Sequence, residues 1–203
     1  MFGVFGLDSQ AAALPRTDPL IAPMPLIRPS QEQDIAAVQA IYAHHVLHGT
    51  GTFETEPPTE ADMAQRRRDV LARDLPWLVA EGDNGRVLGY AYCNWFKPRA
   101  AYRFSAEDSI YLHPDAQGQG LGRALLSELA RQAQARGVRK LIAVIGDSAN
   151  AGSIGLHRSV GFQDVGVITG CGWKFDRWLD IVLMEKALGP GTSQPPAEGA
   201  PSA

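Results

Sequence analysis

Three glycines at alternate positions, Gly118, Gly120 and Gly122, precede a run of residues whose apolar periodicity predicts a helix. A glycine has no Cβ atom, so a ligand can approach its backbone closely. The first N–H groups of a helix have no partner within the helix, and they lie at the positive end of its dipole. The stretch therefore predicts a phosphate-binding site, with a pyrophosphate as the natural ligand.

Two common phosphate-binding motifs do not fit this stretch. The P-loop requires Lys followed by Ser or Thr, where this chain has Arg123 and Ala124. The dinucleotide-binding fingerprint requires a third glycine at position 123, and it follows its strand directly, whereas several residues intervene here. The sequence therefore disfavours a nucleotide-dependent hydride-transfer enzyme.

Residues 117–122 resemble the acetyl-CoA motif of the GCN5-related N-acetyltransferases. Residues 150–157, which are soon followed by Gly161 and Phe162, resemble the second motif of that family. Two further segments, residues 102–112 and 174–180, resemble its phosphinothricin and methionine sulfoximine acetyltransferase subgroup. The resemblance implies that acetyl-CoA is the co-substrate and that the acetyl group passes directly to an amine in a ternary complex, without an acyl-enzyme.

The resemblance also implies which residues bind acetyl-CoA. A strand backbone pairs with the pantetheine arm, the glycine-containing loop wraps the pyrophosphate, and an asparagine contacts the arm. The charge of Arg123 could add to phosphate binding, or this side chain could be a solvated residue of the first helical turn. The predicted cofactor-binding residues are Ile110, Tyr111, Leu112, Gln117, Gly118, Gln119, Gly120, Leu121, Gly122, Arg123 and Asn150.

Two residues are candidates for proton transfer. An amine attacks a thioester only when it is neutral, and an alkylammonium is mostly protonated near pH 7, so a base or a water chain must accept a proton. Glu107 matches the glutamate of the subgroup, and we expect it immediately before the strand that holds the thioester. His157 stands where many members of the superfamily have a tyrosine that protonates the leaving thiolate. A histidine there can donate a proton, act as a second base or be structural.

A second set of residues matches positions that face the acceptor in the subgroup. Cations fit an amino-acid substrate because they can bind its carboxylate while its amine faces Glu107. Lys97 stands where the subgroup often has arginine, so bidentate binding of a carboxylate is lost at this position. The predicted acceptor-binding residues are Lys97, Pro98, Arg99, Arg103, Glu107, Asp108 and Ser109.

Other residue patterns suggest less chemistry. His44 and His48 share a helical face, but no third ligand has suitable spacing, so we predict no metal site. Cys93 and Cys171 fit neither a disulfide framework nor a zinc motif. Trp173, Lys174 and Trp178 are consistent with the site, with a dimer contact or with ordinary packing.

The elements that must position these residues follow from periodicity and turn signals. Residues 30–33 read as a capping box, so a helix is expected from about Gln31, and Arg66 to Arg68 are expected on a solvated helix face. The pattern is α+β, and the resemblance implies a three-layer fold with a mixed central sheet whose fourth and fifth strands splay apart. Helices are expected at 60–73, 121–136 and 153–160, and strands at 26–27, 77–81, 86–95, 109–112, 141–145, 162–168 and 180–186.

Length and composition suit a single globular enzyme. The 203 residues predict one domain, placed at 26–188 between a flexible N-terminal extension (1–25) and a disordered C-terminal tail (189–203). The net charge of −3 gives no reason to expect nucleic acid or an anionic membrane as a partner. The lack of a signal peptide or a long apolar run predicts a cytoplasmic protein. The resemblance implies a homodimer.

The leading hypothesis is an acetyl-CoA-dependent N-acetyltransferase for a small amino-acid-like amine such as phosphinothricin, methionine sulfoximine or methionine sulfone. A protein or peptide N-acetyltransferase with the same fold is an alternative. A noncatalytic acetyl-CoA-binding regulatory module is another, but it would need no base, and the presence of Glu107 argues against it.

Overall fold

The computed structural model describes residues 25–196, so residues 1–24 and 197–203 of the two predicted tails lie outside the described residues. The described chain contains seven strands and four α-helices. In chain order the elements are β1 (Leu26–Pro29), α1 (Ile35–His48), α2 (Glu60–Ala72), β2 (Trp77–Glu81), β3 (Val87–Trp95), β4 (Ser105–Leu112), α3 (Leu121–Ala135), β5 (Lys140–Gly146), α4 (Ala151–Ser159), β6 (Gln163–Lys174) and β7 (Arg177–Ala187).

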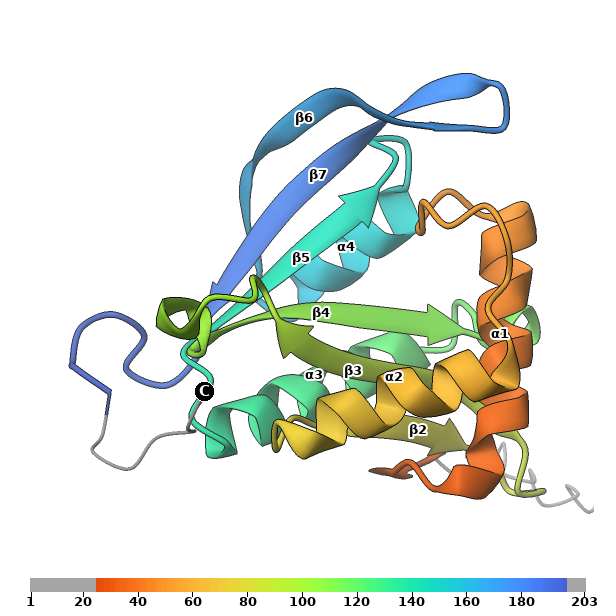
Figure 1. Cartoon of the computed structure of the whole chain (residues 1–203), viewed down its shortest axis with the longest axis horizontal. Helices are drawn as coiled ribbons and strands as arrows, with labels where there is room; N and C mark the ends of the chain where they lie inside the picture. Colours follow the sequence, from red (N-terminus) through yellow and green to blue (C-terminus); the bar gives the residue numbers. More distant parts are fainter. Residues whose placement is uncertain (1–24, 197–203) are drawn as a thin grey trace, which may run out of the picture.

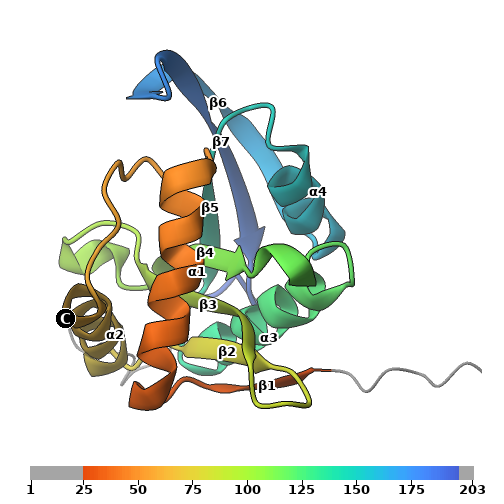
Figure 2. The ribbon, with the colours of Figure 1, turned by 90° about the vertical axis from the view of Figure 1, so that its right-hand side faces the viewer.

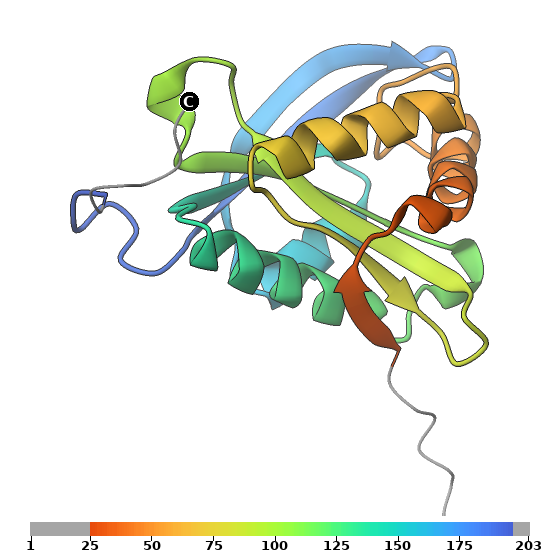
Figure 3. The ribbon, with the colours of Figure 1, turned by 60° about the horizontal axis from the view of Figure 1, so that its bottom comes forward.

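The strands form one mixed sheet in the order β1-β2-β3-β4-β5-β7-β6. Helices α1 and α2 lie on one face of the sheet, and α3 and α4 lie on the other (Figures 1 and 3). The predicted three-layer α+β fold is therefore confirmed.

Strands β4 and β5 are parallel and pair over four residues only, from Ser105 with Lys140 to Asp108 with Ala143. Beyond these pairs, β4 continues to Leu112 along β3, and β5 continues to Gly146 along β7. The two strands diverge in Figure 1, as the predicted splay requires. This divergence opens the sheet between β4 and β5.

Helix α3 buries the apolar face that its sequence predicts. Leu121, Leu125, Leu126 and Leu129 are at most 5% exposed, and α3 packs on β2 and β3. Burial of one such side chain contributes about 1.5–3 kcal/mol, so this face fixes the helix firmly on the sheet. The N-terminus of α3 is thereby held beside the end of β4.

The start of α1 differs from the predicted capping box. A 3₁₀ turn at Glu32–Asp34 precedes the helix, and the Asp34 carboxylate accepts the backbone N–H of Gln31 at 2.7 Å. Ser30, the predicted cap, instead accepts a hydrogen bond from Arg67. Helix α1 therefore begins at Ile35, four residues later than expected.

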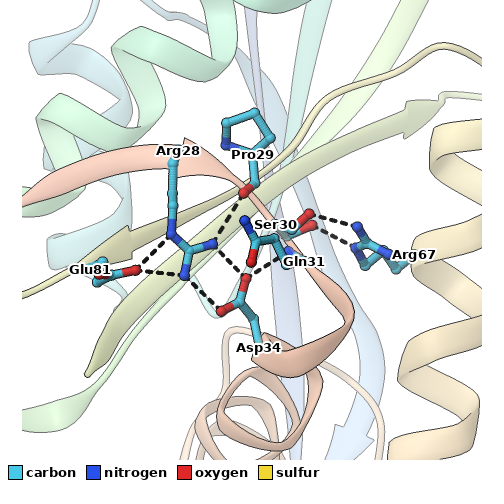
Figure 4. A network of polar contacts seen from close by, with 7 residues as sticks. All are labelled: Arg28, Pro29, Ser30, Gln31, Asp34, Arg67 and Glu81. Carbon is cyan, nitrogen blue, oxygen red and sulfur yellow. Dashed lines mark hydrogen bonds and ion pairs between the residues drawn. The ribbon is translucent and has the colours of Figure 1, made fainter. Parts of the chain in front are cut away.

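A polar network joins β1, β2 and the two helices of one face (Figure 4). The Arg28 guanidinium lies 2.7 Å from the Asp34 carboxylate and 2.6 Å from that of Glu81. Arg67 donates to the hydroxyl and the carbonyl of Ser30 at 2.7 and 2.6 Å. The expectation that Arg67 lies on a solvated face is therefore wrong, because it anchors α2 to the chain that leads into α1.

Strands β6 and β7 are longer than predicted and form a hairpin that projects beyond the sheet (Figures 1 and 2). Its turn is Phe175 and Asp176, whose φ angles of 52° and 54° are those of a tight hairpin turn. Such turns usually contain glycine, and its absence here explains why the sequence signal was weak. In both views the tip lies above the segment that follows α1.

Candidate active site

A cavity of about 980 Å³ lies where β4 and β5 diverge. Its walls come from β4, β5, the N-terminal ends of α3 and α4, and the segment 49–53 that follows α1. The cavity therefore brings the two motif segments, which are far apart in the sequence, to one site.

The three glycines of the loop serve two purposes. Gly118 and Gly120 have φ angles of 74° and 78°, which other residues rarely adopt, and a Cβ at either would meet no atom within 4 Å. Both line the cavity, so their backbone is open to a ligand. A Cβ at Gly122 would instead lie 3.1 Å from the Leu156 side chain, so this glycine lets α3 pack closely against α4.

Two residues of the loop direct their side chains elsewhere. Gln119 donates to the Asp115 carbonyl at 3.0 Å, and Leu121 is 5% exposed in the core. Neither is a lining residue, whereas Gln117 and Arg123 are. Gln119 and Leu121 can therefore act on a ligand through their backbone only.

The divergence leaves one edge of β4 open. The N–H of His113 donates to the Leu88 carbonyl on β3 at 2.8 Å, and alternate residues of a strand direct their backbone groups to the same edge. The backbone groups of Tyr111 therefore face β3, and the N–H groups of Ile110 and Leu112 face the gap. Of the three residues predicted to pair with a pantetheine arm, only these two therefore have N–H groups that face it.

Glu107 lies within β4 and lines the cavity, rather than preceding the strand as expected. Burial raises the pKa of its carboxyl group, the neighbouring Asp108 carboxylate adds to this, and the charge of Lys97 opposes it. A raised pKa makes the carboxylate a stronger base than an exposed glutamate.

The wall near Glu107 contains hydroxyl groups that the sequence interpretation missed. The Tyr42 hydroxyl lies 2.8 Å from Oγ1 of Thr52, and the Tyr42 and Tyr111 rings are 4.9 Å apart. Tyr92 also lines this wall. These tyrosines occur at the spacing of core residues and Thr52 lies in a loop, so only tertiary structure reveals that they share one cavity.

Asp108 points to the opposite face of β4 from Glu107, because successive side chains of a strand alternate. Its Oδ2 atom lies 2.9 Å from Nε2 of His157, and both side chains are at most 3% exposed. Nδ1 of His157 lies 2.8 Å from the Ser153 carbonyl. Asp108, which was predicted to contact the acceptor, thus lines the cavity and also forms a buried pair with His157.

The Asp108 carboxylate changes the titration of His157. Burial lowers the pKa of the imidazole, but the hydrogen bond and the charge of Asp108 outweigh it, so the net pKa is raised. Oγ of Ser153, a residue that lines the cavity, lies 3.4 Å from Nδ1. The protonated form of His157 is thus favoured relative to a free histidine, and the residue lines the cavity beside a hydroxyl group.

Asn150 caps α4: its Oδ1 accepts the N–H of Ser153 at 3.1 Å. Its Nδ2 lies 3.4 Å from the Gly146 carbonyl at the end of β5. Asn150 lines the cavity, and it holds the N-terminus of α4 against the diverging strand.

Four predicted acceptor-binding residues, Lys97, Pro98, Arg99 and Arg103, lie in the segment between β3 and β4 and are not among the lining residues. The Lys97 ammonium lies 4.8 Å from the centre of the Phe96 ring. The Arg103 guanidinium lies 4.3 Å from the centre of the Phe104 ring. Lys97 is nevertheless close enough to oppose the raised pKa of Glu107.

Residues 38–162 match the family described as Acetyltransferase (GNAT) family. The chain belongs to this family. It is 48% identical to phosphinothricin N-acetyltransferase of Alcaligenes faecalis over 170 residues, which are 84% of this chain and 86% of that protein. It is 39% identical to L-methionine sulfoximine/L-methionine sulfone acetyltransferase of Pseudomonas aeruginosa, with 83% and 98% of the two chains covered.

A crystal structure of a GNAT superfamily phosphinothricin acetyltransferase from Sinorhizobium meliloti in complex with AcCoA superposes with a TM-score of 0.85. The two chains are 44% identical, and the match covers 87% of this chain and 95% of the other. The protein is therefore an acetyl-CoA-dependent N-acetyltransferase, as the sequence predicted.

The open backbone at Gly118 and Gly120 and the open edge of β4 fit the two polar parts of acetyl-CoA, its pyrophosphate and its pantetheine amides. Within residues 25–196, no three His, Cys, Asp or Glu side chains form a metal-binding group. None of the described helices is both long and apolar enough to span a bilayer.

Proposed function

We propose that the protein acetylates the amine of a small amino-acid-like substrate of the phosphinothricin, methionine sulfoximine or methionine sulfone type. The names of the relatives at 48% and 39% identity support this substrate class. The observation that carries the proposal is that Glu107, whose pKa is raised by burial, faces the same cavity as the glycine loop.

In this proposal the chain binds its co-substrate mainly through the backbone. The N–H groups of residues 118–123 bind the pyrophosphate, assisted by Arg123, and that of Leu112 pairs with the pantetheine arm. Asn150 contacts the arm from the N-terminus of α4. When bound, acetyl-CoA supplies the thioester from which the acetyl group is transferred.

Glu107 accepts the proton of the acceptor ammonium, directly or through water, so that the amine becomes nucleophilic. The N–H of Ile110 at the open strand edge polarises the thioester carbonyl. Ser109 contacts the acceptor on the same face of β4 as Glu107. We assign the acceptor carboxylate to Lys97, whose charge already reaches Glu107.

His157 supplies the proton for the departing thiolate. Its raised pKa favours the protonated ring, and the Ser153 hydroxyl lies 3.4 Å from Nδ1 on a residue that also lines the cavity. In this relay Ser153 gives its proton to the thiolate and receives one from Nδ1 of His157. The nitrogen loses two protons in each turnover: the first, taken up by Glu107, is released to solvent, and the second, lost after attack, replaces through solvent the proton that His157 gave to the thiolate.

We also propose that two copies pair through the β6–β7 hairpin. Strand β6 is an edge strand of the sheet, and large apolar side chains on the hairpin are exposed to water. An exposed apolar edge strand is a surface that proteins normally cover. The exposed residues are Val165 (58%), Val167 (53%), Ile168 (48%), Trp173 (56%) and Trp178 (65%).

The proposed location of the protein in the cell is the cytoplasm, as the sequence predicts.

The proposal is tested with purified protein, acetyl-CoA and a panel of amines, by following thiol release and the mass of the product. Phosphinothricin, methionine sulfoximine and methionine sulfone are compared with alanine-terminated and lysine-containing peptides. Preference for the first three supports the proposal. Preference for peptides would favour a protein N-acetyltransferase, and tight acetyl-CoA binding without any transfer would favour a regulatory module.

A further inference from the structure

Lys174, the last residue of β6, is buried: only 4% of it is exposed. Its ammonium donates to the carbonyl of Gly49 at 2.9 Å and to that of Thr52 at 2.8 Å. Lysine is rarely buried unless its charge is compensated, and here two carbonyl groups on one segment compensate it. The tip of the hairpin is thereby fastened to residues 49–52, more than 120 residues earlier in the chain.

A second contact joins the same two parts of the molecule. A Cβ at Gly172 would lie 2.4 Å from the Phe53 ring, and a Cβ at Gly146 would lie 2.9 Å from it. The ring therefore occupies the space that side chains at these two positions would fill. Phe53 packs segment 49–53 onto both β5 and the hairpin, beside the Lys174 bonds.

Segment 49–53 forms a wall of the cavity. Its Thr52 contacts the Tyr42 hydroxyl, and it follows α1 on the same face of the sheet as the Glu107 side chain. Its position therefore sets the space that is left for an acceptor beside Glu107. The glycine loop at α3 lies on the other face of the sheet (Figure 3).

We propose that Lys174 is a positioning residue for the acceptor, which holds segment 49–53 at the distance from Glu107 that a small amine requires. Without the ammonium, two partly or fully buried carbonyl groups lose their donor, and the segment moves to regain hydrogen bonds with water. The inference rests on the proposed function for its kinetic readout. It predicts that changes at this distant hairpin alter the binding of the acceptor rather than the binding of acetyl-CoA.

The test is Lys174→Met, which keeps the length of the side chain and removes its donors. The KM for the best amine of the panel should rise about tenfold or more, the effect expected for lost charge-assisted hydrogen bonds, while the KM for acetyl-CoA changes less than twofold. Lys140→Met is the control, because Lys140 pairs with Glu185 at the opposite end of β5. An unchanged acceptor KM in folded Lys174→Met protein would overturn the proposal, since a purely stabilising role lowers the melting temperature only.

Gly172→Ala perturbs the same contact without touching the lysine. The new Cβ would displace the Phe53 ring, so the acceptor KM should again rise more than the acetyl-CoA KM. Hydrogen exchange of the wild-type protein adds a measurement that needs neither variant nor substrate. Segment 49–53 and the hairpin tip should open with similar free energies, whereas a segment that opens independently of the tip would contradict the inference. If no amine is acetylated, the proposed function fails and the exchange result still decides whether the two parts are coupled.

Discussion

Oδ2 of Asp108 lies 2.9 Å from Nε2 of His157, and Asp108 is also the last residue of β4 that pairs with β5. The contact therefore joins β4 to α4 at the point where the sheet begins to open. Because both side chains are buried, loss of either partner would leave the other without compensation. One pair thus fixes the α4 side of the cavity and raises the pKa of His157.

The first prediction concerns stability and pH. The pKa of His157 is raised on folding, so the pair stabilises the protein fully below the ordinary histidine pKa of 6.5 and loses this contribution as pH rises through the higher folded value. Each unit of difference between the pKa values of the folded and unfolded states is worth about 1.4 kcal/mol of stability. In urea titrations, the stability gap between the wild type and His157→Gln should narrow from pH 6 to pH 9. A gap that widens over this range would contradict the assignment of a raised pKa.

Glu107→Gln should lower kcat by about a hundred- to ten-thousandfold, the usual contribution of a general base. The KM for acetyl-CoA should change little, and the loss should shrink at high pH, where more of the amine is already neutral. The wild-type rate should rise with pH around a midpoint above the ordinary glutamate pKa, because burial raises the pKa of Glu107. Glu185→Gln is the control, because Glu185 lies on β7, is partly exposed and pairs with Lys140 outside the cavity. Full turnover of Glu107→Gln between pH 6 and 9 would place the base elsewhere.

Gly120→Val should abolish tight binding of acetyl-CoA while the protein stays folded, because a branched side chain would enter the space above an open backbone. Gly85→Val is a matched control: its φ of 75° is close to the 78° of Gly120, it also has open space around its Cβ position, and it lies in the β2–β3 turn. Both variants carry the same backbone strain. Calorimetric titration should show a loss of acetyl-CoA affinity in Gly120→Val only. Equal acetyl-CoA affinities in the two variants would refute the phosphate-binding site at the glycine loop.

Ser153→Ala should slow thiol release if Ser153 carries the proton from His157. A loss of about tenfold or more in kcat, with unchanged melting temperature and acetyl-CoA affinity, is the expected outcome. The contact of Asn150 with the backbone of residue 153 survives this change, so α4 keeps its cap. An unaltered kcat would leave His157 with its positioning role only.

Val167→Lys should convert the proposed dimer to monomers, because a symmetric interface would place two unpaired charges on its apolar surface. Light scattering during size-exclusion chromatography gives the mass directly. Leu71→Lys on α2 is the control, since Leu71 is also exposed and lies away from the hairpin. A monomeric wild type would refute the interface.

The sequence predicted features that depend on local patterns. The apolar face of α3 and the glycines before it are encoded within about 20 residues, and resemblance to a family supplied the splayed strands. The pairing of Asp108 with His157 was missed for a different reason. The strand was expected to begin at Ser109, so the alternation of β4 could not be applied to Glu107 and Asp108, which point to opposite faces.

Contacts between distant segments could not be predicted in this way. Lys174 reaches Gly49 and Thr52 because the β6–β7 hairpin is long. Its turn contains no glycine, so no pattern in the sequence indicates where the hairpin ends. Arg67 likewise belongs to a run of three arginines typical of a solvated helix, and only the position of Ser30 gives it a partner. Periodicity shows which face of a helix is polar but does not show which partner that face meets.

The short stretch of pairing between β4 and β5 also affects how the molecule unfolds. Within the described sheet, only four residue pairs join the part built from β1 to β4 to the part built from β5, β7 and β6, and the contacts of Asp108 with His157 and of Lys174 with segment 49–53 add to them. A ligand in the gap would touch both parts and complete the interrupted sheet with its own amides. Acetyl-CoA would then stabilise the folded chain by mass action and make the two parts melt as a single cooperative unit. Calorimetric scans with and without the ligand would show this as one sharper transition at higher temperature.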